Sequence, residues 1–256
     1  MSNRIDQVEI YYKPVETLNA LSGVLFYISA LLAIAMPLLS GRVDEPTFQY
    51  ASIAFVIMVA LHASSQGFSS FYFLPRAERE RRKQLLSNAL GVSLTHSQTS
   101  DYYNNERNSG LERLSANLME NSFFGKRVCE AMLKPERIKV TVFAVLLLCA
   151  LLNRESDFGV IIALTQTFFA GGILLGWLKV ELLRMKNERV YNSLYSLHLN
   201  QNGAFNDSEI AILLDEFAEY ESAKSSASIK LSSKVFFKLN PSLTEEWDSI
   251  KIAVGL

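Results

Sequence analysis

An uncharged apolar run from about Leu18 to Leu39 most constrains what this chain can fold into. A bilayer core of roughly 30 Å is crossed by roughly 20 helical residues, so the run is long enough to span a membrane. Three more apolar stretches follow, at about 50–74, 138–152 and 158–183. The third is short, and Arg137 and Lys139 must extend toward the lipid headgroups for it to cross. The pattern predicts an all-α membrane protein with four transmembrane helices.

Composition agrees with a chain that mixes membrane spans and polar segments. Hydrophobic residues make up 49% of the 256 positions, and the formal net charge is −1, which gives no argument for direct binding to nucleic acid. The mostly polar residues 1–17 precede the first run, which is too long for a signal peptide and is expected to stay as a span. Residues 18–74 and 138–183 therefore form two transmembrane hairpins.

Lysine and arginine positions predict the topology. The connection after the first span holds only Arg42, and the connection after the third holds only Arg154. The region between spans two and three opens with "RAERERRK", residues 76–83. Because positive residues concentrate on the cytoplasmic side, we expect the tail 1–17, the region 75–137 and the region 184–256 to be cytoplasmic.

The two larger cytoplasmic regions are expected to be helical. The second span should continue as a helix that ends at Gly91, and one helix or two short ones around Gly125 should end at Pro135, giving a hairpin between spans two and three. The C-terminal region should contain an amphipathic helix over Ile210–Tyr220 whose apolar face needs a partner surface. "IKLSSKVFFKL" is compatible with a strand or an interfacial segment, and Ser242 and Glu245 have capping-box spacing for a last helix.

Polar side chains fall within two of the predicted spans. They are costly in lipid unless they face other helices or water, so they are either the lining of a water-filled path or hydrogen bonds within a helical bundle. We expect spans two and four to pack against each other, with glycines of span four allowing close approach. The candidate path-lining residues are His62, Ser65, Gln66, Ser69, Thr165 and Gln166, and the candidate packing glycines are Gly171, Gly172 and Gly176.

The sequence offers little for catalysis or metal binding. The two cysteines, Cys129 and Cys149, have no metal-ligand spacing, and the histidines His62, His96 and His198 lack a second ligand nearby. Neither a phosphate-binding glycine loop nor a hydrolase or metalloprotease motif is present. We therefore predict no catalytic residues, no metal and no cofactor, with a membrane enzyme using a histidine as the less favoured alternative.

One polar stretch, "DYYNNERN" at residues 101–108, stands out between the spans. Asparagine and aspartate are ordinary turn residues, but two adjacent tyrosines are less ordinary there. Together with "NLMENSFF" downstream, the stretch is a candidate trigger or partner site, with structural packing as the alternative. The residues of this site are Asp101, Tyr102, Tyr103, Asn104, Asn105, Glu106, Asn117, Glu120 and Asn121.

Four spans, cytoplasmic ends and a helical middle region with "YYNNE" and "SANLMENSFF" give a layout that resembles the small multi-span membrane effectors of bacterial anti-phage defence. These include effectors associated with retrons and with cyclic-nucleotide signalling. The resemblance implies a toxic homo-oligomer in the bacterial inner membrane, with lipid as one partner. It also implies a trigger, either a regulatory protein or a nucleotide or nucleic-acid signal from a neighbouring gene's system. A non-toxic scaffold or sensor that recruits a soluble partner is the alternative function.

Overall fold

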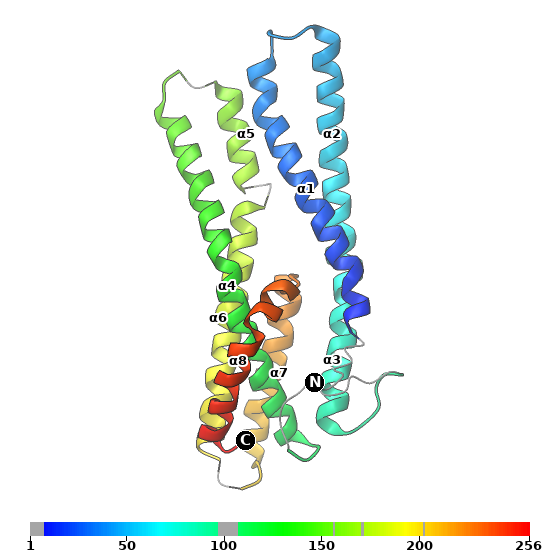
Figure 1. The fold of residues 1–256 in the computed structure, drawn as a ribbon, viewed down its shortest axis with the longest axis vertical. Helices are drawn as coiled ribbons and strands as arrows, with labels where there is room; N and C mark the ends of the chain where they lie inside the picture. The colour runs from blue at the N-terminus through cyan, green and yellow to red at the C-terminus, as the bar shows by residue number, and fades with distance from the viewer. Residues whose placement is uncertain (1–7, 97–106, 156, 170–171, 202) are drawn as a thin grey trace. The chain divides into compact units, whose positions relative to one another are not determined.

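The computed structural model describes residues 8–96, 107–155, 157–169, 172–201 and 203–256, and all regular secondary structure within them is helical (Figure 1). This confirms the all-α prediction. The elements are α1 (Glu9–Leu39), α2 (Glu45–Phe68), the π-helical turn η1 (Ser69–Phe73), α3 (Leu74–Leu90), α4 (Leu111–Leu152), α5 (Phe158–Phe169), α6 (Ile173–Leu199), α7 (Asp207–Ala227) and α8 (Ser233–Val254).

The chain divides into two compact units. The polar unit comprises Met1–Lys13, Leu74–Met132 and Val180–Leu256, and the apolar unit comprises Pro14–Phe73 and Leu133–Lys179. The backbone passes between the units four times, within α1, at the junction of η1 and α3, within α4 and within α6. Every passage is therefore made by helical backbone.

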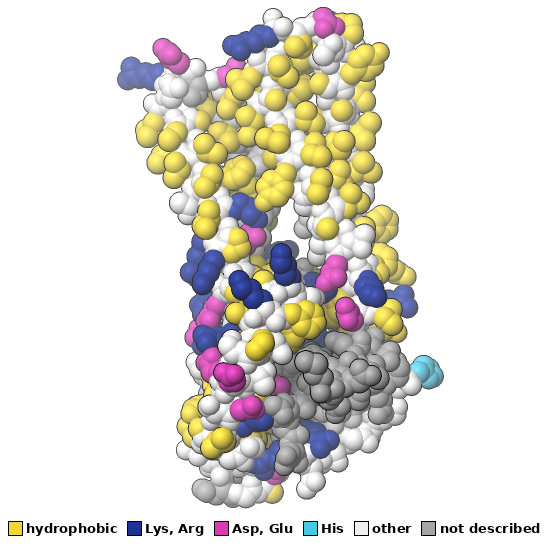
Figure 2. All heavy atoms as spheres, viewed as in Figure 1, with side chains coloured by type: hydrophobic (Ala, Val, Ile, Leu, Met, Phe, Trp, Pro, Cys, Tyr) yellow, Lys and Arg dark blue, Asp and Glu magenta, His cyan; other side chains and the backbone are white. Residues whose placement is uncertain are grey.

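The apolar unit has the surface of a membrane protein. Three helical stretches, Glu9–Leu39, Glu45–Leu90 and Phe158–Leu199, are long and apolar enough to cross a bilayer. Only 6% of the most apolar window of the second stretch is buried within the protein, so its side chains need another apolar environment. Figure 2 shows apolar side chains covering the visible face of this unit, with charges at the end that carries the helix connections. The predicted third span, at the end of α4, is not among the three stretches, so a four-span topology stays a prediction.

A contiguous apolar core holds the polar unit together. Trp247 of α8 is 1% exposed and stacks on Phe123 of α4, with ring centroids 5.9 Å apart. The remaining buried members come from α4, α6, α7 and α8, namely Leu118, Met119, Val190, Leu194, Leu197, Leu213, Tyr220, Leu243 and Val254. Burying an aliphatic or aromatic side chain stabilises a fold by about 1.5–3 kcal/mol, so these contacts are the main source of this unit's stability.

The face of α7 that the sequence left without a partner is covered by the chain itself. Leu213 and Tyr220 are buried in the core of the polar unit, and Phe217 packs against it. An asparagine capping box starts this helix, with the Asn206 side chain accepting from the backbone of Ser208 and Glu209. The amphipathic pattern therefore reflects intramolecular packing.

Several predicted helix ends are wrong and one is confirmed. The helix before Pro135 does not end there, because α4 continues as one helix through Gly125 and Pro135 to Leu152. "IKLSSKVFFKL" is not a strand, because its residues from Ser233 onward belong to α8, which starts after the cap Ser232, while an interfacial location stays a prediction. Ser242 is consequently inside a helix and donates to the Leu239 carbonyl, so it does not form a capping box. Gly91, by contrast, follows the end of α3 with φ of +68°, as predicted.

Gly125 permits a close approach of α4 and α6. A Cβ at this position would lie 2.7 Å from Oδ1 of Asn187, which is buried and has no hydrogen-bond partner among the described residues. The Asn187 side chain is held because its amide nitrogen donates to the Leu183 carbonyl at 2.7 Å. A methyl group at position 125 therefore meets an atom that cannot easily move.

We predict that Gly125→Ala lowers the free energy of unfolding by about 1–3 kcal/mol, the usual cost of overpacking. The loss should shrink in an Asn187→Ala background, where the clashing atom is gone. Chemical denaturation of the detergent-solubilised protein measures both. Gly67→Ala is the matched control, because a Cβ there meets nothing within 4 Å. An equal loss in both backgrounds would contradict the clash.

Candidate functional site

A cavity of about 420 Å³ lies within the polar unit, a size typical of small-molecule sites. Its wall combines charged, amide and aromatic side chains. The lining residues come from the start of α1 and the residue before it (Val8, Glu9, Tyr12), α3 (Glu78, Arg81, Gln84), α4 (Asn121, Phe124, Gly125, Val128), α7 (Tyr220, Lys224), the connection to α8 (Lys230, Leu231) and α8 itself (Ser233, Phe236, Phe237).

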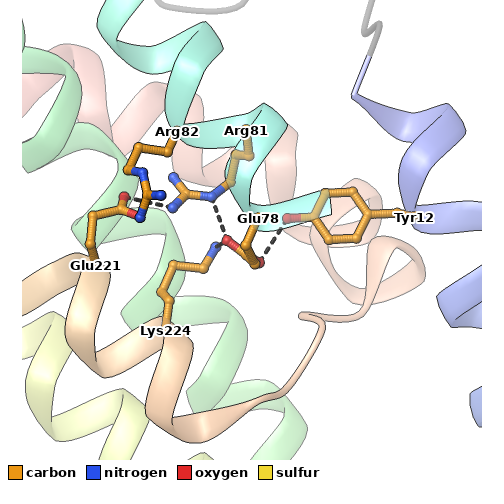
Figure 3. Close-up of polar contacts among 6 residues, drawn as sticks. All are labelled: Tyr12, Glu78, Arg81, Arg82, Glu221 and Lys224. Carbon is orange, nitrogen blue, oxygen red and sulfur yellow. Dashed lines mark hydrogen bonds and ion pairs between the residues drawn. The ribbon is translucent and has the colours of Figure 1, made fainter. Parts of the chain in front are cut away.

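The carboxylate of Glu78 joins three helices at one side of this cavity (Figure 3). Its Oε1 accepts from the Tyr12 hydroxyl of α1 at 2.7 Å, and its Oε2 accepts from Nε of Arg81 at 2.7 Å. Nζ of Lys224 on α7 lies 3.4 Å from Oε2. One carboxylate thereby connects α1, α3 and α7.

A second carboxylate extends the cluster. Nη2 of Arg81 donates to Oε1 of Glu221 at 2.6 Å, and Nη1 of Arg82 lies 3.7 Å from Oε2 of the same residue. The Arg81 guanidinium thus bridges Glu78 and Glu221. It also lies over the Tyr220 ring, 5.5 Å from its centroid.

Electrostatics in this cluster favour charged side chains. Burial alone would raise the pKa of Glu78, but the attraction of Lys224 and Arg81, with hydrogen bonds from Arg81 and Tyr12, lowers that pKa to about 2. Burial lowers the pKa of Arg81, yet the neighbouring Glu78, Tyr220 and Glu221 outweigh it and raise the pKa. Burial also raises the pKa of Tyr220, which remains a neutral phenol. The cluster is therefore a set of mutually compensated buried charges.

The structure brings one residue of the predicted trigger site to this cavity. Asn121 lines it, whereas Asn117 is fully buried and donates to Oδ1 of Asn88 at 2.8 Å, which packs α4 against α3. Glu120 is buried, with 9% of its surface exposed. The other predicted members, residues 101–106, lie outside the described residues.

In the apolar unit, polar residues of α2 and of η1 contact α1. The Ser22 hydroxyl of α1 donates to Oε1 of Gln66 at 3.2 Å, and Nδ1 of His62 lies 3.0 Å from the Ser22 carbonyl. Oγ of Ser69 donates to Oδ1 of Asn19 at 2.7 Å. Ser65 is also buried, at 7% exposure. Much of this predicted path-lining face is thus used in helix pairing.

The corresponding residues of the fourth predicted span lie differently. Thr165 and Gln166 are exposed, and Thr165 bonds to the Ile161 carbonyl of its own helix. In this span α5 ends at Phe169 and α6 starts at Ile173, and residues 170 and 171 between them lie outside the described residues. Gly172 has φ of +86° and precedes α6, and a Cβ on Gly176 would meet nothing within 4 Å, while Gly171 lies outside the described residues. Pairing of spans two and four stays a prediction.

The histidines lie in separate environments. His96 is exposed, and His62 belongs to α2. His198 is 4% exposed, and its Nε2 lies 2.9 Å from Oγ of Ser115, a serine with no exposed surface. Its Nδ1 lies 3.2 Å from Oε1 of Gln201, so the Nδ1–H tautomer satisfies both contacts. The arrangement of Ser115, His198 and Gln201 resembles the serine–histidine pair of a hydrolase with its third residue. Ser115 is completely buried, however, so no substrate can reach its hydroxyl. We therefore interpret the pair as a packing contact.

The charge cluster was missed at the sequence level. "RAERERRK" reads as the charged flank of a span, and it contains both Glu78 and Arg81. A usable signal is that Glu78 and Arg81 are three residues apart, as are Glu221 and Lys224, so each pair shares a helix face. Because 140 residues separate Arg81 from Glu221, their contact has no local signature.

We predict that Glu78→Gln lowers the free energy of unfolding of the polar unit on the order of 3 kcal/mol, because Arg81 and Lys224 lose their shared buried partner. Trp247 fluorescence during denaturation, in a Trp177→Phe background, reports on this unit. Glu80→Gln is the matched control on the same helix, since Glu80 pairs, among the described residues, with the more exposed Lys83 and should cost about 0–1 kcal/mol. Equal losses in both variants would contradict the cluster's role.

A pH dependence is expected from His198. Burial is the main reason that its pKa lies below 6.5 in the folded protein. The unfolded chain therefore binds a proton more readily, so this contribution to stability is complete above pH 6.5 and is lost as pH falls toward the folded pKa. His198→Gln retains an acceptor for Ser115 but does not titrate. Stability measured from pH 8 to 5 should fall less in the variant, and identical slopes would refute the assignment.

Comparisons of the chain with protein-family models, with curated proteins and with solved structures found no match.

Proposed function

We propose that the protein is a bacterial inner-membrane effector of anti-phage defence, which assembles as a homo-oligomer and permeabilises the membrane when its polar unit receives a trigger. The layout of spans and the "YYNNE" and "SANLMENSFF" segments support this function by resemblance. Both termini and the polar unit are placed in the cytoplasm by the distribution of lysine and arginine, with the end of α4 as a fourth span. We also propose that the protein acts on the membrane without catalysing a reaction.

The observation that carries the proposal is the continuity of helical backbone between the two units. α1, α4 and α6 each contribute residues to both units, and α3 follows η1 directly. Each passage between the units is helical, so no flexible linker absorbs a shift of a helix in the polar unit. A change at the cavity is thereby passed into the membrane segments through the main chain.

The pairing of α1 with α2 supports a closed resting state. Gln66 and Ser69 are engaged by Ser22 and Asn19, so they are not available to line a path while these bonds persist. Opening requires their exchange for water or for another subunit's groups, and the π-helical turn η1 starts at Ser69. Such turns often mark functional positions. A silent protein that opens on a trigger fits this arrangement.

The alternative function is a scaffold that recruits a soluble partner, and it was based on the need of the apolar face of α7 for a partner surface. That face is occupied by the polar unit's own core through Leu213 and Tyr220.

We predict that induced expression, with the neighbouring genes that supply the trigger, depolarises a bacterial host as growth stops. A membrane-potential dye measures this. Replacing Ser65, Gln66 and Ser69 together by leucine should abolish most of the depolarisation, because the polar face formed by the end of α2 and the start of η1 is lost. Ser52→Leu is the matched control in α2, since Ser52 bonds to the Phe48 carbonyl of its own helix.

Two results would contradict the proposal. Growth arrest with an unchanged membrane potential would remove permeabilisation as the mechanism. Full depolarisation by the triple variant would show that the polar face of α2 does not line the path.

A further inference from the structure

The first turns of α8 carry an exposed face on which an aromatic ring lies between two lysines. Lys234, Phe237, Lys238 and Pro241 are spaced as i, i+3, i+4 and i+7, so they share one side of the helix, and all four are exposed. Phe237 keeps 64% of its surface exposed, although a phenyl ring is more stable away from water. The face therefore fits a surface that is apolar and negatively charged.

The opposite side of α8 is occupied by the protein itself. Phe236 lies against Phe124 of α4, with ring centroids 5.9 Å apart, and Leu239 packs on the core of the polar unit. Phe237 borders the cavity edge-on to Phe236, with ring centroids 5.5 Å apart. The core thereby fixes the orientation of α8 and keeps the face with the two lysines on the outside.

Both lysines of this face are available for an external partner. Within the residues that the structure describes, Lys234 and Lys238 form no ion pair, hydrogen bond or ring contact. They differ in this respect from Lys224, which is engaged by Glu78.

Charge is distributed unevenly along α8 and the segment that leads into it. Residues 222–244 contain four lysines and neither aspartate nor glutamate. The acidic residues of α8 all lie in its second half, at Glu245, Glu246 and Asp248. An anionic surface therefore attracts the start of the helix and repels its second half.

The start of α8 lies at the end of the polar unit that α1 and α4 leave. The backbone N–H of Ser232, the cap of α8, donates to Sδ of Met132 at 3.4 Å, and Met132 is the last residue of α4 in the polar unit. Lys230, just before this cap, lies over the Tyr12 ring of α1, 5.1 Å from the centroid. The apolar unit begins at Pro14, two residues after Tyr12.

The length of α1 sets the distance to the membrane. Leu18, where the first predicted span begins, is 18 − 12 = 6 residues beyond Tyr12. Six helical residues rise by about 9 Å, and the headgroup region on each side of a bilayer is roughly 5–8 Å thick. The lysines of α8 have long stems, so their ammonium groups can reach lipid headgroups.

We propose that the exposed face at the start of α8 binds the anionic headgroup surface of the membrane that the apolar helices cross. Lys234 and Lys238 pair with lipid phosphates, and Phe237 enters the boundary between headgroups and acyl chains. The negative potential of a cytoplasmic leaflet favours such basic segments. The contact needs only that the apolar helices lie in a bilayer, so it does not rest on permeabilisation.

Lipid quenching of tryptophan fluorescence tests this contact in the full-length protein. Phe237→Trp is made in a Trp177→Phe background and placed in nanodiscs of phosphatidylcholine brominated on its acyl chains, with or without phosphatidylglycerol. The parent protein measures the signal of Trp247, which is 1% exposed. We expect bromine to quench the introduced tryptophan, by about twofold more when phosphatidylglycerol is present, because lysines near an anionic surface favour the contact.

Two matched controls lie at the other end of α8. Ile252 is 83% exposed and 252 − 237 = 15 residues further along, a rise of about 22 Å, so the tryptophan of Ile252→Trp should not be quenched. Replacing Lys234 and Lys238 together by glutamine should remove the additional quenching that phosphatidylglycerol causes. Lys251→Gln should leave it unchanged, because Lys251 pairs with Asp248 in the acidic half of the helix.

Circular dichroism verifies that each variant is folded. Equal quenching of Phe237→Trp and Ile252→Trp would overturn the proposal, and so would quenching that persists unchanged in the double glutamine variant. A shift of the introduced tryptophan's emission to shorter wavelength without quenching would show that a second copy of the chain covers this face, which would also overturn it. Because no step measures growth or membrane potential, failure of the effector function and failure of this contact are distinguishable.

Discussion

The polar unit depends on the Glu78 carboxylate being paired on every side. A buried charge costs several kcal/mol to desolvate, and here that cost is met by Tyr12, Arg81 and Lys224 from three helices. Because Arg81 also pairs with Glu221, the loss of one member changes the environment of all the others. The cluster therefore connects α1, α3 and α7 through contacts that depend on one another. Contacts in an apolar core are more nearly independent.

Much of the fold could be predicted from the apolar runs, since long uncharged stretches have few structural solutions. The start and end of helices were less certain. Pro135 gave a strong local stop signal, yet α4 continues through it despite a local cost of about 3 kcal/mol for proline inside a helix. Ser242 and Glu245 had the spacing of a cap, but a helix that had already begun at Ser233 overrides it.

The candidate site was harder to predict because its residues are distant in the chain. Asn121 was identified as part of a polar segment, but Tyr12 and Lys230 had no local feature that distinguished them. In the membrane segments the polar residues of α2 were found, while their partners Asn19 and Ser22 were not. Asn19 and Ser22 are three residues apart and share a helix face, as do Gln66 and Ser69. A comparison of the polar faces of neighbouring spans would therefore have indicated that α1 pairs with α2.

The division of the polar unit into three chain segments has a consequence for biosynthesis. Trp247 and Leu243, near the end of the chain, complete the same core as Leu118 and Phe123 of α4. The ribosome therefore synthesises the three stretches that are apolar enough to cross a bilayer before α8, which completes the wall of the polar unit. During that interval the cavity is open on the side that α8 later closes. The apolar helices are thus synthesised before the core of the polar unit can close around Trp247.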